Sequence, residues 1–140
     1  MSSPLSSINV NFTSREDIFL TTKLRPTDLG GTRCRYAVSR FLEELSTDYL
    51  DLLLIHAPDV PPILSMAPSS AQQVILMSCH PLHLLQPQAK LRAETWRCLQ
   101  ELQEQGVLRS IGVSNYDTAL LQEVVNLGGT QPQVIALKFR

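Results

Sequence analysis

Four polar residues stand at the ends of three successive apolar runs in this sequence: Lys23, His56, and the adjacent Ser114 and Asn115. They offer a cation, an imidazole that can donate or accept a proton, and hydroxyl and amide groups that form hydrogen bonds. Polar residues repeated at the carboxyl ends of parallel strands are how a β/α barrel assembles an active site. The series therefore predicts that these four side chains share one site.

Each of these residues also has an ordinary structural interpretation. Lys23 alone fits a surface lysine at a strand end, and His56 alone fits a histidine satisfied within a core. Ser114 and Asn115 fit the start of a helix, where such side chains cap free N–H groups. Their ordered placement after similar apolar runs favours the functional interpretation, and capping and ligand binding can coexist.

The elements that would position these residues alternate between strand and helix. The predicted strands cover residues 18–24, 49–56, 110–113 and 133–139. The second of these strands shows little alternation between apolar and polar residues, which is typical of a parallel strand covered on both faces.

Between the strands, apolar residues recur at intervals of three and four, which indicates helices with one buried face. The first helix covers about 32–45, and its apolar face contains Cys34, Val38, Phe41, Leu42 and Leu45. The second has Leu91, Thr95, Cys98, Leu99 and Leu102 on one face, Trp96 beside them, and Gly106 at its end. The third starts after a candidate cap, Asp117, and is buried through Leu120, Leu121, Val124 and Val125.

Strands that alternate with helices of this length predict an α/β fold with a parallel sheet. At 140 residues the chain is short for a closed eight-stranded barrel, which needs about 250 residues. We therefore expect a partial (β/α)8 TIM barrel of about four parallel strands with helices on the outside.

The sequence also predicts how the domain is organised. Residues 1–14 form a polar stretch that we expect to be a flexible lead-in, and 15–140 form one barrel-like domain. Within that domain, 57–88 is an insert that holds six of the nine prolines and is uncharged from Val60 to Ala89. An apolar connection of this length predicts either a packed lid or a segment foreign to the rest of the fold.

Composition excludes several classes of protein. The net charge is -1 without a basic cluster, which argues against a nucleic-acid partner, and no apolar run reaches the roughly 20 residues of a membrane span. The three cysteines form no disulfide framework, so the cytoplasm is the predicted location. One short cluster, Cys79, His80 and His83, is a weak match to a metal site because no second ligand pair accompanies it, and we predict no metal.

Three segments resemble the aldo-keto reductase family. They are residues 15–24 (REDIFLTTKL), 48–56 (DYLDLLLIH) and 111–116 (IGVSNY), and the helical stretch 94–97 with Gly106 is also similar. Any one of these motifs is a weak signal, whereas together they are specific. The resemblance covers about residues 15–58 and 89–134.

The resemblance implies a β/α barrel that reduces small aldehydes and ketones with NADPH. It makes Lys23 the catalytic lysine and His56 the catalytic histidine, and it makes Ser114 and Asn115 the cofactor-binding pair that hydrogen-bonds the nicotinamide carboxamide. Hydride attack on a carbonyl carbon leaves charge on the oxygen, toward which a proton donor must point. In the family that donor is a tyrosine, which a lysine held by an aspartate makes more acidic.

The sequence departs from the family at both ends. No tyrosine precedes Tyr36, and Asp17 lies on the wrong side of the first strand, so neither the family's tyrosine nor its aspartate has a counterpart. Ile135 and Ala136 replace an Asn-Gln pair whose glutamine touches the nicotinamide. These departures predict a truncated member or isoform with impaired activity. The alternative is a non-catalytic isoform, or an interaction or regulatory fragment, that self-associates through exposed sheet edges.

Overall fold

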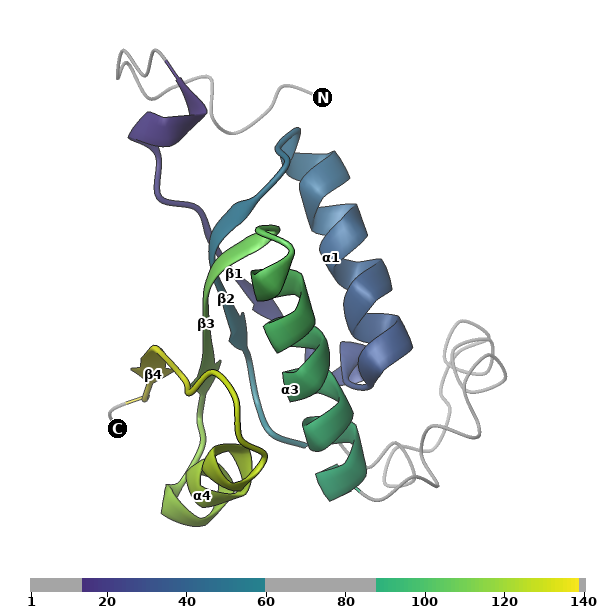
Figure 1. The fold of residues 1–140 in the computed structure, drawn as a ribbon, viewed down its shortest axis with the longest axis vertical. Coiled ribbons are helices and arrows are strands. Elements are labelled where there is room, and N and C mark those ends of the chain that lie inside the picture. The colour runs from purple at the N-terminus through teal and green to yellow at the C-terminus, as the bar shows by residue number, and fades with distance from the viewer. Residues whose placement is uncertain (1–13, 60–87, 139–140) are drawn as a thin grey trace, which may run out of the picture.

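The computed structural model describes residues 14–59 and 88–138. In chain order the elements are the 3-10 turn η1 (Arg15–Asp17), β1 (Thr21–Leu24), the 3-10 turn η2 (Pro26–Asp28), α1 (Gly31–Leu45), β2 (Leu50–Ile55), α3 (Gln88–Glu104), β3 (Leu108–Ser114), α4 (Thr118–Asn126) and β4 (Val134–Ala136). The strands form one sheet in the order β1-β2-β3-β4, and every pair is parallel. The predicted α/β fold with four parallel strands is confirmed (Figure 1).

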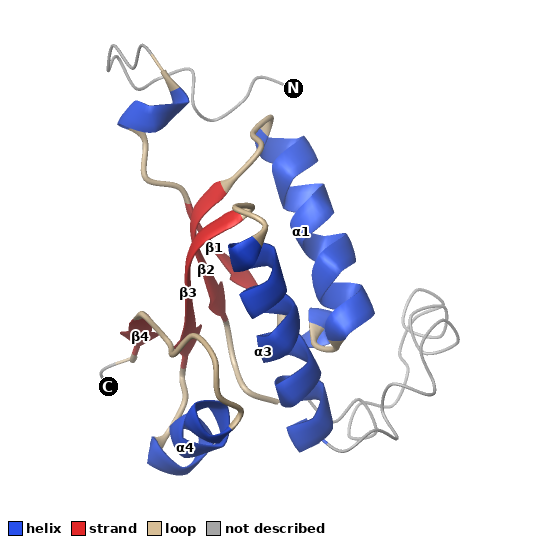
Figure 2. Ribbon diagram, in the orientation of Figure 1, coloured by secondary structure: helices blue, strands red, loops and turns tan. Residues whose placement is uncertain are grey.

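Two helices cover one face of this sheet. Figure 2 shows α1 and α3 side by side along the strands. In α1 the buried residues Cys34, Ala37 and Val38 recur at the predicted spacing, and in α3 the whole predicted apolar face is buried together with Trp96. No helix within the described residues is long and apolar enough to cross a membrane.

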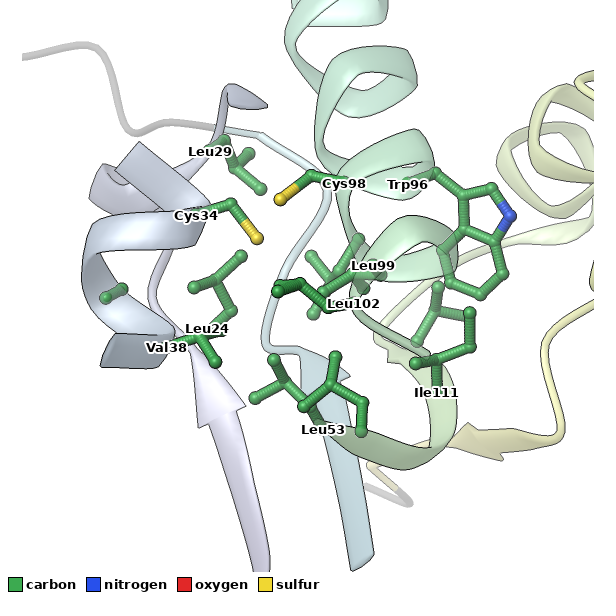
Figure 3. Packing of buried hydrophobic residues seen from close by; sticks show 14 of the residues in the cluster. Leu24, Leu29, Cys34, Val38, Leu53, Trp96, Cys98, Leu99, Leu102 and Ile111 are labelled. Atoms are coloured by element: carbon green, nitrogen blue, oxygen red, sulfur yellow. The ribbon is translucent and has the colours of Figure 1, made fainter. Parts of the chain in front are cut away.

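The core lies between these helices and one set of alternate strand residues. Leu24, Leu53 and Ile111 pack against the helices (Figure 3), and Ile55 and Val113 belong to the same buried cluster. Neighbouring side chains along a strand point to opposite faces. The other set of alternate residues in β1, β2 and β3 therefore points away from α1 and α3.

β2 is buried along its entire length, as expected for a strand covered on both faces. Leu52 and Leu54, which lie outside the helix-side cluster, are still only 7% and 4% exposed. The second face of the sheet is therefore also protected at this strand.

Local sequence signals explain how several elements start. Asp117 caps α4 as predicted, because its Oδ1 accepts a hydrogen bond of 2.9 Å from the Leu120 N–H. Gly30 precedes α1 at φ 104°, and its N–H donates to Thr95 Oγ1 at 2.7 Å, which ties this turn to α3. A β-carbon on Gly30 would also crowd the Leu91 side chain, so this turn requires glycine.

Some details of the helix faces and element ends differ from the predictions. Leu45 and Val125 were predicted to be buried, but both are exposed, because Leu45 closes the last turn of α1 and Val125 lies on the outer side of α4. β1 starts at Thr21 instead of residue 18, and β4 covers only three residues.

Of the predicted insert, 57–59 is loop and Gln88 already begins α3. The rest of the insert, and the lead-in through residue 13, lie outside the described residues.

Candidate functional site

Strand register places three of the four predicted residues on one face of the sheet. Lys23 pairs with Leu54, and Leu54 pairs with Gly112. His56 lies two residues beyond Leu54, and Ser114 lies two residues beyond Gly112. Because side chains alternate along a strand, Lys23, His56 and Ser114 share the face that points away from α1 and α3. We call this the site face.

The fourth residue, Asn115, joins the ends of three strands. Its backbone has φ 61°, a left-handed conformation that asparagine adopts more readily than most residues. Its side-chain Nδ2 donates to the His56 carbonyl at 2.7 Å and to Ser114 Oγ at 3.1 Å. Its backbone N–H donates to the Ala136 carbonyl at 3.0 Å. The structure therefore brings His56, Ser114 and Asn115 into direct contact.

Ser114 and Asn115 keep hydrogen-bonding groups that fit a primary carboxamide. Both N–H groups of the Asn115 amide are already donated, but within residues 14–59 and 88–138 nothing donates to its Oδ1. The Ser114 hydroxyl accepts from Asn115 and keeps its own proton to donate. A carboxamide presents one NH2 donor group and one carbonyl acceptor, which match these two free groups. The site thus suits the nicotinamide carboxamide that the resemblance implies.

Lys23 and His56 are both accessible on the site face. Their side chains are exposed, and the part of the chain that the structure describes contains no hydrogen bond or ion pair to the Lys23 ammonium. An exposed imidazole on the same face as an exposed ammonium can donate a hydrogen bond to a substrate oxygen while the ammonium stabilises negative charge there.

No tyrosine of this sequence meets Lys23. Tyr36 lies exposed on α1, on the helix side of the sheet. Tyr49 precedes β2, at the opposite end of the sheet from the site, and its ring lies between the guanidinium groups of Arg15 and Arg109 at 4.0 and 3.8 Å.

Tyr116 follows Asn115 but is buried, and within the described residues its hydroxyl has no hydrogen-bond partner. Burial raises the pKa of this phenol above its ordinary value, against the opposing charge of Arg92. A phenol made less acidic by burial is a poor proton donor, so Tyr116 is best explained as a packing residue.

The β4 register shows which face of the sheet holds Ile135 and Ala136, the residues that replace the Asn-Gln pair. Ala136 pairs with Ser114, so its methyl group lies on the site face and supplies no hydrogen bond there. Ile135 pairs with Val113, a core residue, and therefore belongs to the other face. Position 136 is thus next to Ser114, where the resemblance implies a glutamine.

Sequence reasoning missed one residue that supports the site, Arg92 on α3. Its side chain is only 10% exposed, and its Nη1 donates to Asp59 Oδ1 at 2.6 Å. Its Nε and Nη2 donate to the two carboxylate oxygens of Glu123 on α4, at 2.9 and 3.1 Å. Asp59 follows His56 by three residues, and α4 follows Asn115. Arg92 therefore ties together the two loops that carry the site.

A second network lies at the opposite end of the sheet. The buried Asp51 carboxylate accepts from Arg15 Nη2 at 2.8 Å and from the Leu20 N–H at 2.9 Å. Burial by itself would raise the pKa of Asp51, but the Leu20 and Arg15 hydrogen bonds outweigh it and hold that pKa below its ordinary value. Asp51 lies at the start of β2 and forms a structural ion pair there, whereas the predicted site residues lie at the carboxyl ends of the strands.

No group of three or more potential metal ligands occurs within the described residues. Cys79, His80 and His83, the weak metal motif of the sequence, lie outside them.

Comparison with known proteins agrees with this geometry. Residues 6–140 match the model of the aldo/keto reductase family. The chain is 34% identical over 116 residues to the human aldo-keto reductase family 1 member C2. It is 31% identical over 132 residues to the NAD(P)H-dependent D-xylose reductase of Scheffersomyces stipitis. The crystal structure of an aldo/keto reductase from Brucella melitensis superposes with a TM-score of 0.67 at 34% identity.

These matches cover most of this chain but a minority of each relative. The human and yeast alignments cover 82% and 94% of this chain, and 33% and 41% of the relatives. The Brucella structure covers 90% of this chain, which corresponds to 39% of that structure. The chain thus spans a third to two fifths of the length of these proteins, and the expected partial barrel is confirmed.

Proposed function

We propose, because the chain belongs to the aldo/keto reductase family, that its site face is the nicotinamide- and carbonyl-binding part of an NADPH-dependent carbonyl reductase. The observation that carries this proposal is the register that places Lys23, His56 and Ser114 together on one face, with Asn115 joining their strands. Ser114 and Asn115 would hold the cofactor. The substrate would be a small aldehyde or ketone.

Bound NADPH would supply a hydride to the carbonyl carbon. Asn115 Oδ1 and the Ser114 hydroxyl would bind the carboxamide and so fix which face of the nicotinamide is presented to the site. The His56 imidazole would donate a hydrogen bond to the substrate oxygen, and the Lys23 ammonium would stabilise the negative charge that develops there.

These residues by themselves would reduce carbonyl compounds slowly. All three tyrosines of the sequence are occupied elsewhere, so no phenol adjoins Lys23 to donate the proton. Loss of a positioned general acid lowers a rate by about 10²–10⁴-fold. We therefore expect NADPH binding with weak turnover.

The test is a fluorescence titration with NADPH, followed by a measurement of aldehyde-dependent NADPH oxidation. Saturable binding, with residual oxidation that Lys23→Met abolishes and Lys90→Met preserves, would support the proposal. Lys90 is a matched control because it is an exposed lysine on α3, paired with Glu94 at 3.8 Å. Absence of NADPH binding by a folded chain would contradict the proposal.

A second candidate role is self-association with another copy of this chain. β1 and β4 are the edges of the sheet within the described residues, and exposed apolar side chains accompany both. Phe19 precedes β1, while Ile135 and Leu137 at β4 are 48% and 59% exposed. A strand edge with unpaired backbone groups and apolar side chains is a template for pairing, and the small net charge offers little repulsion.

Size-exclusion chromatography with light scattering tests this second role. We expect a dimer or larger species at increasing protein concentration, and we expect Ile135→Lys to shift the population toward monomer. A wild-type chain that stays monomeric throughout would exclude self-association.

A further inference from the structure

Two cysteines face each other where α1 packs on α3. Cys34 of α1 and Cys98 of α3 are both buried and both carry free thiols. Figure 3 shows their sulfur atoms pointing toward one another across the helix contact. No role in the proposed reductase site involves them, because they lie on the helix side of the sheet.

Cys98 is the thiol nearer to solvent, although only 3% of the residue is exposed. Cys98 lines an open groove of about 420 Å³ between α1 and α3, together with Thr32, Arg35 and Arg97. Cys34 is fully buried behind it and does not line the groove. A small reagent in the groove would therefore meet Cys98 first.

The contact also differentiates the two thiols chemically. The contact with Cys34 and the charge of Arg35 lower the pKa of Cys98 despite its burial. The same contact, followed by burial, raises the pKa of Cys34. Because only Cys98 of the two lines the groove, a small disulfide there meets Cys98, which is therefore the attacking sulfur, and Cys34 is the resolving one.

We propose that Cys34 and Cys98 form a reversible dithiol–disulfide site whose co-substrate is a small organic disulfide admitted by the groove between α1 and α3. This site is independent of the proposed reductase function. It adds a covalent link between the two helices that cover the sheet.

The exchange takes place in two balanced steps. The Cys98 thiolate attacks one sulfur of the small disulfide, the S–S bond breaks, and one small thiolate leaves with a mixed disulfide on Cys98. Cys34 then loses its proton to that small thiolate and attacks the Cys98 sulfur, which releases a second small thiolate. This second thiolate takes up the proton that Cys98 lost when it ionised. Two protein thiols are oxidised to one disulfide, and one small disulfide is reduced to two thiols.

The test uses the folded chain of 140 residues and oxidised glutathione as the probe. After incubation, the remaining thiols are alkylated in denaturant and the protein is digested and analysed by mass spectrometry. We expect one bond that links the Cys34 and Cys98 peptides in the wild type, with Cys79 alkylated, and the same bond in Cys79→Ser. Three alkylated cysteines, or a first bond that includes Cys79, would overturn the proposal.

Single substitutions test the order of attack. Cys34→Ser should accumulate a mixed disulfide between Cys98 and glutathione, whereas Cys98→Ser should leave Cys34 unmodified in the folded chain. Modification of Cys34 in folded Cys98→Ser would contradict the assigned roles.

If either single variant does not fold, the melting temperature of the Cys79→Ser chain still tests whether Cys34 and Cys98 form a disulfide in the native fold. A link between α1 and α3 restricts the unfolded chain, so the oxidised form should melt several degrees higher and a reductant should reverse the shift. An unchanged or lower melting temperature would show that the sulfurs do not bond within the native helix contact.

Discussion

The side-chain amide of Asn115 donates a hydrogen bond of 2.7 Å to the backbone carbonyl of His56 and so joins the ends of β3 and β2. The bond uses an Asn115 backbone in the left-handed region, at φ 61°. Two separate properties of this residue, its amide and its backbone conformation, therefore hold the site loops together.

Two substitutions separate these properties. Asn115→Gly removes the side-chain bonds but accepts the left-handed backbone, and should lower the free energy of unfolding by about 1 kcal/mol. Asn115→Ala removes the same bonds and adds the cost of a left-handed alanine, so it should lose a further 1 kcal/mol or so. Urea unfolding measures both. Equal stability of the two variants would show that the backbone conformation is not strained.

Ala136→Gln should tighten NADPH binding. The new glutamine side chain would lie on the site face beside Ser114, where its amide can reach the nicotinamide. One added hydrogen bond corresponds to roughly a fivefold lower Kd for NADPH. Ile135→Gln is the matched control, because position 135 belongs to the opposite face and should give no gain. Fluorescence titration compares the variants, and a gain in the control alone would reverse the assignment of faces.

Arg92→Leu should release both loops that carry the site. Three hydrogen bonds to Asp59 and Glu123 are lost, but these carboxylates are half exposed and regain water. The expected loss in the free energy of unfolding is therefore about 1–3 kcal/mol, below the cost of stranding a buried charge. Arg97→Leu changes an exposed arginine on the same helix and should be nearly neutral. Faster amide exchange at residues 56–59 in Arg92→Leu alone would identify the ion pairs as the cause.

Asp51 should make the fold sensitive to acid. Its pKa lies below the ordinary value in the folded chain, so the folded state favours the ionised carboxylate. The stability that this group contributes is complete above the pKa of the unfolded chain and is lost as the pH falls through the lower folded pKa. Asp51→Asn should therefore be less stable than wild type at neutral pH and lose less stability on acidification. Thermal melts across an acid pH series test this, and parallel curves for the two proteins would contradict it.

Much of the fold followed from local patterns in the sequence. The order of strands and helices, the apolar face of α3 and the Asp117 cap all depend on residues close together in the chain, where spacing reports directly on packing. The site face followed as well, because Lys23, His56 and Ser114 each close an apolar run and parallel strands end at the same edge.

Other features depend on partners that local spacing does not show. Residues 18–20 were expected in β1, but Arg15 Nη1 donates to the Ile18 carbonyl and the Leu20 N–H donates to the Asp51 carboxylate. The Ile18 carbonyl and the Leu20 N–H are thus bound by side chains, and the Asp51 carboxylate that binds Leu20 lies 31 residues away. Arg92 could not be identified for the same reason, since its partners lie more than 30 residues away on either side.

The most direct test of the central claim is an NMR titration of the isotopically labelled chain with NADPH. Binding at the site face should shift the Asn115 side-chain amide, the Ser114 backbone amide and the His56 ring signals together. Signals from Tyr36 and the outer surface of α1 should stay in place. Shifts confined to the helix side of the sheet, or none at saturating cofactor, would contradict the assignment of this face as the nicotinamide site.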